Sequence, residues 1–517
     1  MNQTEPQVGC FGRLFSRRSS LWRSQQSRDE PPHQPQLENH EVQVRPEGYG
    51  TEIREALKIS EKEKQEIHFF NPSCNYSYSE ESEWWLDPQH PPSYTPSDLP
   101  FPDLEVAKTV EVTLDSLGPQ LRELSLKIHS CPELQFQERY AHDILTHFMA
   151  THGFHVNRHY LGLHTAWRAE FSYGTEGRVI GVNSEMDALK GLGHACGHNL
   201  IAASGVGIAI AIKSAMQAHK VSGKVVLLGT PAEEAGGGKI ILLDRGGYKD
   251  MDACIMCHPS PGIPHSACVG TTIALQDIEV EYFGQGAHAA AAPWEGTNAL
   301  DAAFLAYSGI SLLRQQMKPD HRIHGIVQGK DWSPNGNNSI CTGLKDLGSY
   351  NSAVIPDYAQ MRWIVRAPTV EELHAFVKRA TNCLEAAAIS TSCKATLKFN
   401  APYFELRQNS VLARAFSDTA LNRYGVVTKH DPFSASTDFG NVSHALPSLH
   451  PAFAIPTEAK GGNHTAAFAK SAATVEAHAA MMCIAKALAL TGYRILADAA
   501  FCNQVKAAFE AQKERAF

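Results

Sequence analysis

The segment 182–200, VNSEMDALKGLGHACGHNL, constrains the fold more than any other part of the sequence. An apolar run typical of a β-strand reaches Asp187, passes a glycine-rich turn and enters a long apolar helix. The turn and the start of the helix carry His194, Cys196 and His198. Thiol and imidazole groups at this spacing suit a transition metal, although a glycine-rich turn with ordinary core histidines gives the same pattern.

Strand-like and helix-like segments alternate around this turn. Two helices come first, and strands then alternate with helices over the ranges 178–187 (strand), 198–220 (helix), 223–234 (strand), 239–248 (helix) and 252–260 (strand). Parallel strands joined by helices are connected by right-handed crossovers. The order therefore predicts an α/β fold with a mainly parallel sheet that helices cover on both faces.

The pattern of the sequence changes at Thr271. From there the order is strand, helix, strand, strand, helix, strand, which is typical of a small α+β domain of ferredoxin-like type with one exposed sheet face. After Lys394 the earlier pattern returns. We therefore predict an α/β domain formed by residues 103–269 and 395–517, interrupted by a smaller domain at 270–394.

The N-terminal residues, the net charge and the cysteines indicate where the protein is located and which partners it could bind. Residues 1–102 are rich in Pro, Ser, Gln, Glu and Arg, and we predict a mostly disordered arm because they offer little apolar surface to bury. A net charge of −8 gives no indication of nucleic-acid binding. We expect no membrane span and no secretory signal, and the twelve cysteines are typical of reduced thiols in the cytoplasm.

Candidate functional residues collect at the predicted strand ends. The first strand finishes at Asp187, the second at Glu233–Glu234 and the third at His258, while Cys196 and His198 begin the helix after the first strand. Active sites of open parallel sheets lie at the carboxyl ends of strands, so these groups should converge. Neighbouring carboxylates point in different directions, so one of the two glutamates can bind a metal while the other acts as a base.

Further residues are candidates with simpler alternatives. Cys254, Cys257 and His258 match a haem-attachment pattern, but that chemistry needs export, and packing in the core is the simpler interpretation of the cysteines. His288 lies in the small-residue loop GQGAHAAAAPWEG, where a substrate could approach closely, or it is an exposed loop histidine. Arg366 suits bidentate capture of a carboxylate, or it is a surface arginine. His464, in GGNHTAAF, is a plausible last ligand or an ordinary loop histidine.

These residues lie in motifs that together resemble a known family. MDAL-(x)4-HACGHNL, GTPAEEAGGGK, CHPS, GAHAAAAPWEGTNALDA, STDFGNVS and GGNHTAAF follow one another in the order seen in family twenty of the metallopeptidases. That family includes aminoacylase, carboxypeptidase G and amidohydrolases that release amino acids from conjugates. Within it, the sequence is most similar to the branch of dipeptidases that release a basic C-terminal residue.

The resemblance implies a role for each candidate. It implies two divalent metal ions, with zinc favoured and manganese or cobalt also used in relatives. Glu233 would be the general base and Asp187 would orient the site. The smaller domain would be a lid and a dimerisation domain whose His288 polarises the scissile carbonyl. Arg366, Asn335 and Ser436 would face the substrate, and the metal ligands would be Cys196, His198, Glu234, His258 and His464.

One departure from the family pattern and two alternatives stay open. Residues 336–353 separate Asn335 from Val354, which adjoin in relatives, so they interrupt a lid loop as a true insertion or as a mistranslated gene segment. We expect a hydrolase of dipeptides. The alternatives are an amidohydrolase of N-acyl amino acids or other conjugates, and a catalytically impaired scaffold protein that works through its N-terminal arm.

Overall fold

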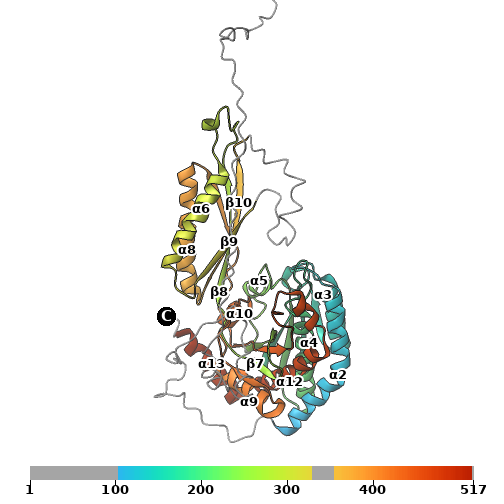
Figure 1. Cartoon of the computed structure of the whole chain (residues 1–517). Helices are drawn as coiled ribbons and strands as arrows, with labels where there is room; N and C mark the ends of the chain where they lie inside the picture. The colour runs from blue at the N-terminus through green and yellow to red at the C-terminus, as the bar shows by residue number, and fades with distance from the viewer. Residues whose placement is uncertain (1–102, 329–353, 515–517) are drawn as a thin grey trace, which may run out of the picture. The chain divides into compact units, whose positions relative to one another are not determined.

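The computed structural model describes residues 103–328 and 354–514 (Figure 1). The predicted arm at 1–102, the substrate-site candidate Asn335 and the insertion at 336–353 lie outside the described residues.

The largest sheet has six strands in the order β1-β2-β4-β3-β5-β13. β3 pairs in parallel with β4 and β5, and β5 with β13, whereas β2 runs antiparallel to both β4 and β1. The strands are β1 (His155–Arg158), β2 (Trp167–Tyr173), β3 (Arg178–Glu185), β4 (Gly223–Thr230), β5 (Ala253–Ile255) and β13 (Ser448–Leu449). The predicted α/β class is confirmed, but the sheet is mixed, because sequence reasoning missed the short, polar β1 and its partner β2.

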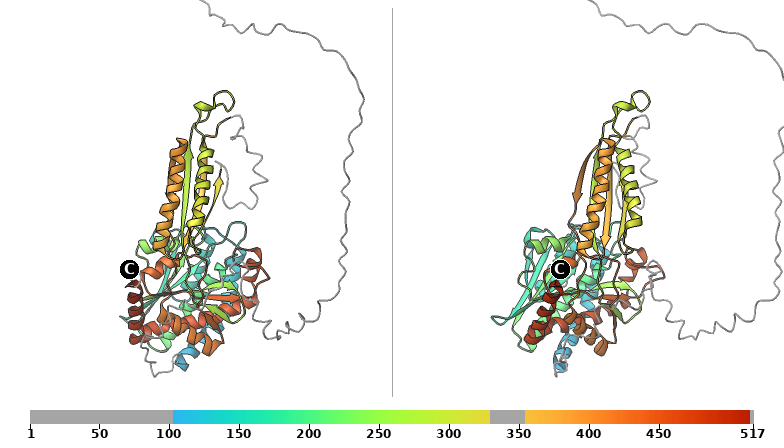
Figure 2. Two further views of the ribbon diagram at one scale, coloured as in Figure 1. Left: turned by 60° about the vertical axis from the view of Figure 1, so that its left-hand side comes forward. Right: turned by 90° about the vertical axis from the view of Figure 1, so that its left-hand side faces the viewer.

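Helices rich in alanine, leucine and isoleucine pack beside this sheet (Figures 1 and 2). Their core includes Val182, Leu227 and Ile255 from the strands. The helices are α2 (Leu104–Ser130), α3 (Arg139–Thr151), α4 (His198–Ala218), α5 (Gly238–Asp244) and α12 (Val475–Ala497). α4 and α12 are long and apolar enough to span a bilayer, but 89% and 78% of their most apolar windows are buried inside the protein. The apolar residues of α4 and α12 therefore pack mostly in the protein core.

A second sheet of four short strands lies in the order β12-β7-β14-β6. Its strands are β6 (His258–Pro261), β7 (Ser266–Cys268), β12 (Val427–Lys429) and β14 (Ala452–Ile455). The C-terminal part of the chain also forms the helices α9 (Ser410–Tyr424), α10 (Phe439–Ala445), α11 (Ala466–Ser471) and α13 (Ala499–Glu514). The single strand predicted at 252–260 is thus two strands, and His258 begins β6 rather than ending β5. β6 contains two prolines and pairs only with β14 at the edge of its sheet, where prolines are tolerated.

A third sheet is entirely antiparallel, in the order β11-β8-β10-β9. Its elements follow the predicted strand–helix–strand–strand–helix–strand order: β8 (Ala274–Phe283), α6 (Ala299–Leu313), β9 (Arg322–Gln328), β10 (Tyr358–Ala367), α8 (Val370–Thr391) and β11 (Lys394–Phe399). Alternate residues of β10 are buried, and Trp363, Tyr282 and Phe376 form a core with α6 and α8. β11 pairs with β8 as far as Phe399, so this sheet extends beyond the boundary predicted at Lys394. The division into two domains stays a prediction.

Candidate metal centre

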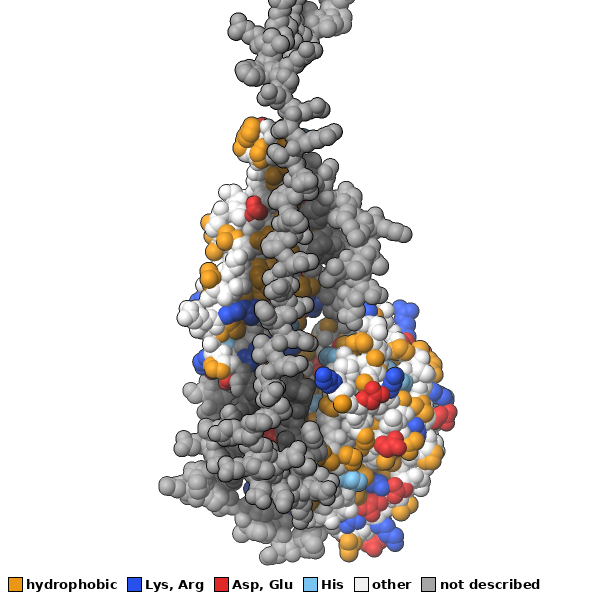
Figure 3. All heavy atoms as spheres, in the orientation of Figure 1, with side chains coloured by type: hydrophobic (Ala, Val, Ile, Leu, Met, Phe, Trp, Pro, Cys, Tyr) orange, Lys and Arg blue, Asp and Glu red, His pale blue; other side chains and the backbone are white. Residues whose placement is uncertain are grey.

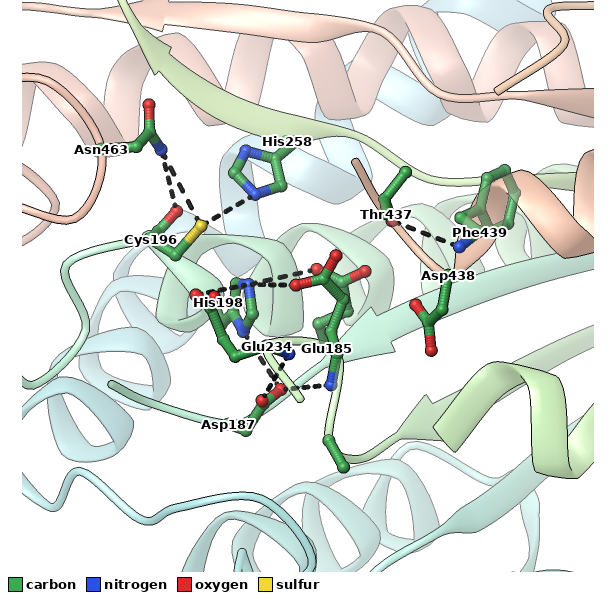
Figure 4. Close-up of polar contacts among 12 residues, drawn as sticks. Glu185, Asp187, Cys196, His198, Glu234, His258, Thr437, Asp438, Phe439 and Asn463 are labelled. Carbon is green, nitrogen blue, oxygen red and sulfur yellow. Dashed lines mark hydrogen bonds and ion pairs between the residues drawn. The ribbon is translucent and has the colours of Figure 1, made fainter. Parts of the chain in front are cut away.

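The predicted site residues gather where β3, β4 and β6 meet the N-terminus of α4 (Figure 4). The Cys196 Sγ lies 3.3 Å from the His258 Nε2, and the His464 Nε2 lies 3.4 Å from a Glu234 carboxylate oxygen. Two sets of ligand atoms form, each with all atoms within 4.8 Å of one another: Cys196 with His198 and His258, and Cys196 with Glu234 and His464. These two sets, which share one thiol, contain enough ligand groups for two divalent cations.

The donor atoms at this cluster fit divalent metal ions. Both ring nitrogens of His198 and one carboxylate oxygen of Glu234 are buried without a hydrogen-bond partner. Buried polar atoms are normally paired, and imidazole nitrogens and carboxylate oxygens left without a hydrogen bond are the atoms that bind divalent metal ions. His258 adds a preset orientation, because its Nδ1 lies 2.8 Å from the carbonyl oxygen of Pro259 and its Nε2 faces the thiol. That arrangement is typical of a metal-binding imidazole.

Gly197 allows the two ligand-bearing segments to approach each other. Its φ of 83° lies in the left-handed region, and a Cβ at this position would meet the Cγ of Pro259 at 2.5 Å. A side chain here would therefore push the Cys196–His198 turn away from the start of β6. The glycine in HACGHNL thus has a packing reason that follows from the geometry of the centre.

Asp187 holds the turn that carries both glutamates. One of its oxygens accepts from the Glu233 amide at 3.1 Å and lies 3.3 Å from the His198 Nδ1. The other oxygen accepts from the Glu234 amide at 3.0 Å. Asp187 is fully enclosed, so this carboxylate fixes the backbone after β4 and the orientation of one imidazole at the same time.

Burial and mutual repulsion oppose ionisation of the acidic groups at the centre. Burial, together with repulsion from Glu185 and Glu234, holds the pKa of Glu233 well above its usual range. Burial and the charge of Glu234 raise the pKa of the Cys196 thiol. Burial alone would lower the pKa of His198, but contacts with Asp187, Cys196 and Glu185 raise it overall. Bound cations would compensate this charge and allow the thiol to ionise.

The substrate-side candidates are placed differently. Arg366, at the end of β10, donates from Nη1 to the Ser436 Oγ at 2.9 Å, and Ser436 donates to the Ile273 carbonyl. The two residues are therefore brought together. His288 is exposed, and its Nδ1 accepts from the amides of Ala290 and Ala291 within its own loop. Its side-chain hydrogen bonds stay within this loop, its backbone forms a bridge with Val354, and its role stays a prediction.

Comparison with known proteins assigns the family. Residues 181–486 match Peptidase family M20/M25/M40. The chain belongs to this family. The M20 chain is 36% identical over 439 residues to the Xaa-Arg dipeptidase of Mus musculus, covering 82% of this chain and 95% of the relative. It is 37% identical over 422 residues to the Xaa-Arg dipeptidase of Homo sapiens, covering 77% and 90%.

A solved structure shares the fold. A dinuclear metal-binding peptidase of the M20 family from Bacillus subtilis superposes with a TM-score of 0.54 at 20% identity, covering 74% of this chain and 99% of that chain. The family match and the two dipeptidase relatives confirm the predicted resemblance, and the M20 chain is a hydrolase. The roles of its individual site residues stay predictions.

Three charged residues beneath the centre of this M20 hydrolase escaped sequence reasoning. The Lys239 Nζ lies 2.6 Å from a Glu185 oxygen and 2.6 Å from an Asp438 oxygen, and all three side chains are fully buried. Glu185 in turn lies 3.4 Å from the His198 Nε2 and forms a third compact set with His198 and Glu233. A signal existed for Glu185, because residues two apart on a strand share a face, which pairs it with Asp187.

Three other supporting residues were also missed. Glu138 accepts from the Ala232 amide, and Tyr403 contacts the same turn through its hydroxyl group. The Asn463 amide donates to the Pro259 carbonyl at 3.3 Å and to the Cys196 carbonyl at 3.5 Å (Figure 4). These contacts join segments far apart in the chain, so neither periodicity nor spacing could indicate them.

Proposed function

We propose that the chain is a two-metal peptidase that cleaves a peptide or amide bond next to a free amino acid. The observation that carries this proposal is the pair of ligand sets that share Cys196, with Glu233 beside them. The Xaa-Arg dipeptidases of mouse and human extend the proposal to dipeptides with a basic C-terminal residue.

The proposed metal ligands are the five residues of the two sets. Cys196 belongs to both sets, His198 and His258 complete one set, and Glu234 and His464 complete the other; together these residues would hold two divalent ions. Two divalent ions would supply Lewis-acid polarisation of the scissile carbonyl and would acidify water. The mixture of thiol, imidazole and carboxylate favours zinc, and manganese or cobalt are the alternatives.

Glu233 is the proposed general base. It lies beside the ligands, with one oxygen 3.8 Å from the His198 Nε2, and its raised pKa makes it a group that can hold a proton. It takes the proton of the attacking water and passes it to the departing amine. Asp187 keeps the backbone of Glu233 in place during both transfers. The substrate carboxylate would bind at Arg366 and Ser436, and His288 would polarise the scissile carbonyl. Asn335, outside the described residues, stays a further candidate for substrate contact.

The third sheet is the proposed lid and dimerisation domain, of ferredoxin-like type. Its helix α6 carries exposed hydrophobic side chains, with Phe304 58% and Leu312 77% exposed. Hydrophobic side chains are visible on the surface formed by α6 and α8 (Figure 3). A patch of this kind supports contact with a second copy of the chain. Nine cysteines among the described residues are free thiols, which supports a reducing compartment such as the cytoplasm.

One experiment tests the proposal. The full chain is loaded with Zn²⁺, Mn²⁺ or Co²⁺, its metal content is measured, and it is assayed against dipeptides with C-terminal Lys or Arg and against N-acyl amino acids. We expect two ions per chain and turnover of the dipeptides. Turnover of the N-acyl series alone would favour the amidohydrolase alternative. Metal binding without turnover would favour the scaffold alternative.

The Glu233→Gln variant tests the general base. It should keep both ions but lose turnover by several orders of magnitude, because the amide cannot accept the proton. Glu281→Gln is the matched control, since Glu281 accepts from the Tyr358 hydroxyl in the third sheet. Normal hydrolysis by the Glu233→Gln variant would remove the assignment.

A further inference from the structure

Tyr403 joins the turn that carries Glu233 to another part of the fold. It lies between β11 and α9, and its hydroxyl donates to the Glu233 carbonyl oxygen at 2.9 Å. The same hydroxyl accepts from the Gly237 amide at 2.9 Å. The turn between β4 and α5 comprises residues 231–237. The Tyr403 hydroxyl therefore links its third residue, Glu233, to its last residue, Gly237.

The turn needs such support because its backbone is strained. Ala232, immediately before Glu233, has a φ of 58°, a left-handed conformation that costs free energy for any residue with a Cβ. The Ala232 amide donates to Glu138, and the amides of Glu233 and Glu234 donate to Asp187. Carboxylates therefore hold the amides at the start of the turn, while Tyr403 holds a carbonyl and the amide at its end.

The backbone of Tyr403 leads to the proposed carboxylate site. Its amide donates to the Leu275 carbonyl at 2.9 Å, and the Leu275 amide donates to the Tyr403 carbonyl at 2.8 Å. Leu275 lies directly opposite Arg366 in the β8–β10 register. Two backbone steps and one side chain therefore connect Arg366 with the carbonyl group of Glu233.

We propose that Tyr403 is a positioning residue that couples the capture of the substrate carboxylate at Arg366 to the placement of the Glu233 carboxylate. This inference rests on the proposed function and deepens it. Without the hydroxyl, the Glu233 carbonyl and the Gly237 amide lose their partner, and the strained turn can relax. Glu233 then departs from the position in which it can accept a proton, and such misplacement costs rate rather than binding.

The first test is Tyr403→Phe in the full-length, metal-loaded enzyme. We expect kcat to fall on the order of 100-fold with KM within about threefold of the parent value. The matched control is Tyr282→Phe, which removes a buried hydroxyl that donates to the Leu384 carbonyl in the core of the third sheet. Both variants should lose thermal stability similarly. A fall in kcat no larger than that of Tyr282→Phe would overturn the proposal.

The second test measures the coupling. In an Arg366→Ala background, Tyr403→Phe should reduce kcat/KM by no more than about threefold, because the substrate carboxylate no longer binds at Arg366 and there is no binding event for Tyr403 to couple to Glu233. Full additivity of the two substitutions would show that Tyr403 acts on the turn alone and would overturn the coupling.

A third readout does not depend on turnover. In the Co²⁺-substituted protein, Tyr403→Phe should shift the visible absorption bands, since Glu234 lies in the same turn, and Tyr282→Phe should leave them unchanged. Identical spectra for all three proteins would overturn the positioning role. If the parent cleaves nothing but the spectral shift is present, the proposed reaction fails while the positioning role is supported.

Discussion

Charged groups are treated in opposite ways at the metal centre and in the third sheet. Beneath the centre, His198, Glu185, Lys239 and Asp438 have no solvent exposure at all, and each carboxylate or ring lies within about 3.4 Å of an oppositely charged or titratable group. In the third sheet, the Lys318 side chain that pairs with Glu372 is 62% exposed.

The difference indicates how each region works. Buried charges cannot be compensated by water, so those under the centre must hold one another in one geometry before any substrate arrives. Exposed charges in the third sheet are hydrated and can move at little cost. The centre is therefore preorganised by its interior, whereas the exposed Lys318–Glu372 pair is free to move. Substitutions in the two regions should differ accordingly.

The largest effect is expected for Lys239→Met. The substitution removes the cation between Glu185 and Asp438 and leaves two buried carboxylates without their partner. Breaking a buried ion pair in this way should lower the free energy of unfolding by about 3–5 kcal/mol. Urea denaturation of the metal-free protein measures it. Lys213→Met is the matched control, because the Lys213 ammonium lies over the rings of Phe154 and Phe171. An equal fall in the free energy of unfolding in the two variants would contradict a stabilising role of the buried Glu185–Lys239–Asp438 network.

A smaller effect, with a defined pH dependence, is expected at Glu138. Burial is the main cause that raises the pKa of its carboxyl to about 7, with repulsion from Asp187 adding to it and the Thr165 hydrogen bond opposing it. Because the folded pKa is raised, the stabilisation is fully present below the ordinary glutamate pKa and is lost as pH rises towards 7. Over that pH range the free energy of unfolding of the parent should fall by up to about 3 kcal/mol more than that of the Glu138→Gln variant, because the glutamine cannot ionise.

Urea denaturation of the metal-free proteins between pH 4.5 and pH 8 measures this difference. Glu133→Gln is the control, because the Glu133 carboxylate accepts from the Tyr140 and Ala141 amides and has partial access to solvent. Parallel curves for the parent and Glu138→Gln would show that Glu138 is ionised in the folded protein throughout the window.

The outcome at the centre shows how far a sequence can lead. The rule that functional groups lie at strand ends brought together Cys196, His198, Glu234 and His258, because the alternation of strands and helices is visible in the sequence. His464 came from a late loop and from the family resemblance, and His258 begins β6 instead of ending β5. The Glu185–Lys239–Asp438 network was missed, because a lysine after three glycines looks like a surface residue until α5 and α10 are packed together. The edge strand β1 was missed for a related reason, since its short polar sequence mimics a loop, and β2, which lies between β1 and β4, was missed with it. Tyr403 gives no sequence signal for its hydroxyl contacts.

At the substrate side, Arg366→Ala should affect binding rather than folding. A charge-assisted hydrogen bond to a carboxylate contributes about 2 kcal/mol, so KM for dipeptides should rise on the order of 30-fold. The kcat for dipeptides should fall as well, because the proposed coupling through Tyr403 to Glu233 is lost. C-terminally amidated dipeptides, which lack the carboxylate, should be cleaved equally by parent and variant. Steady-state kinetics on both substrate series measure this. A selective fall in kcat for both series would place Arg366 at the reacting bond instead.

The smallest effect is expected for Lys318→Ala, and it tests the comparison from its other side. Lys318 pairs with Glu372, whose second oxygen lies 2.9 Å from the His321 Nε2, so the carboxylate keeps a partner when the lysine is removed. The free energy of unfolding should fall by no more than about 0.5 kcal/mol, and by less in 0.5 M NaCl, because exposed pairs are hydrated and screened. A fall in the free energy of unfolding close to that of Lys239→Met would contradict the comparison. It would mean that the exposed Lys318–Glu372 pair stabilises its part of the fold as strongly as the buried network stabilises the centre.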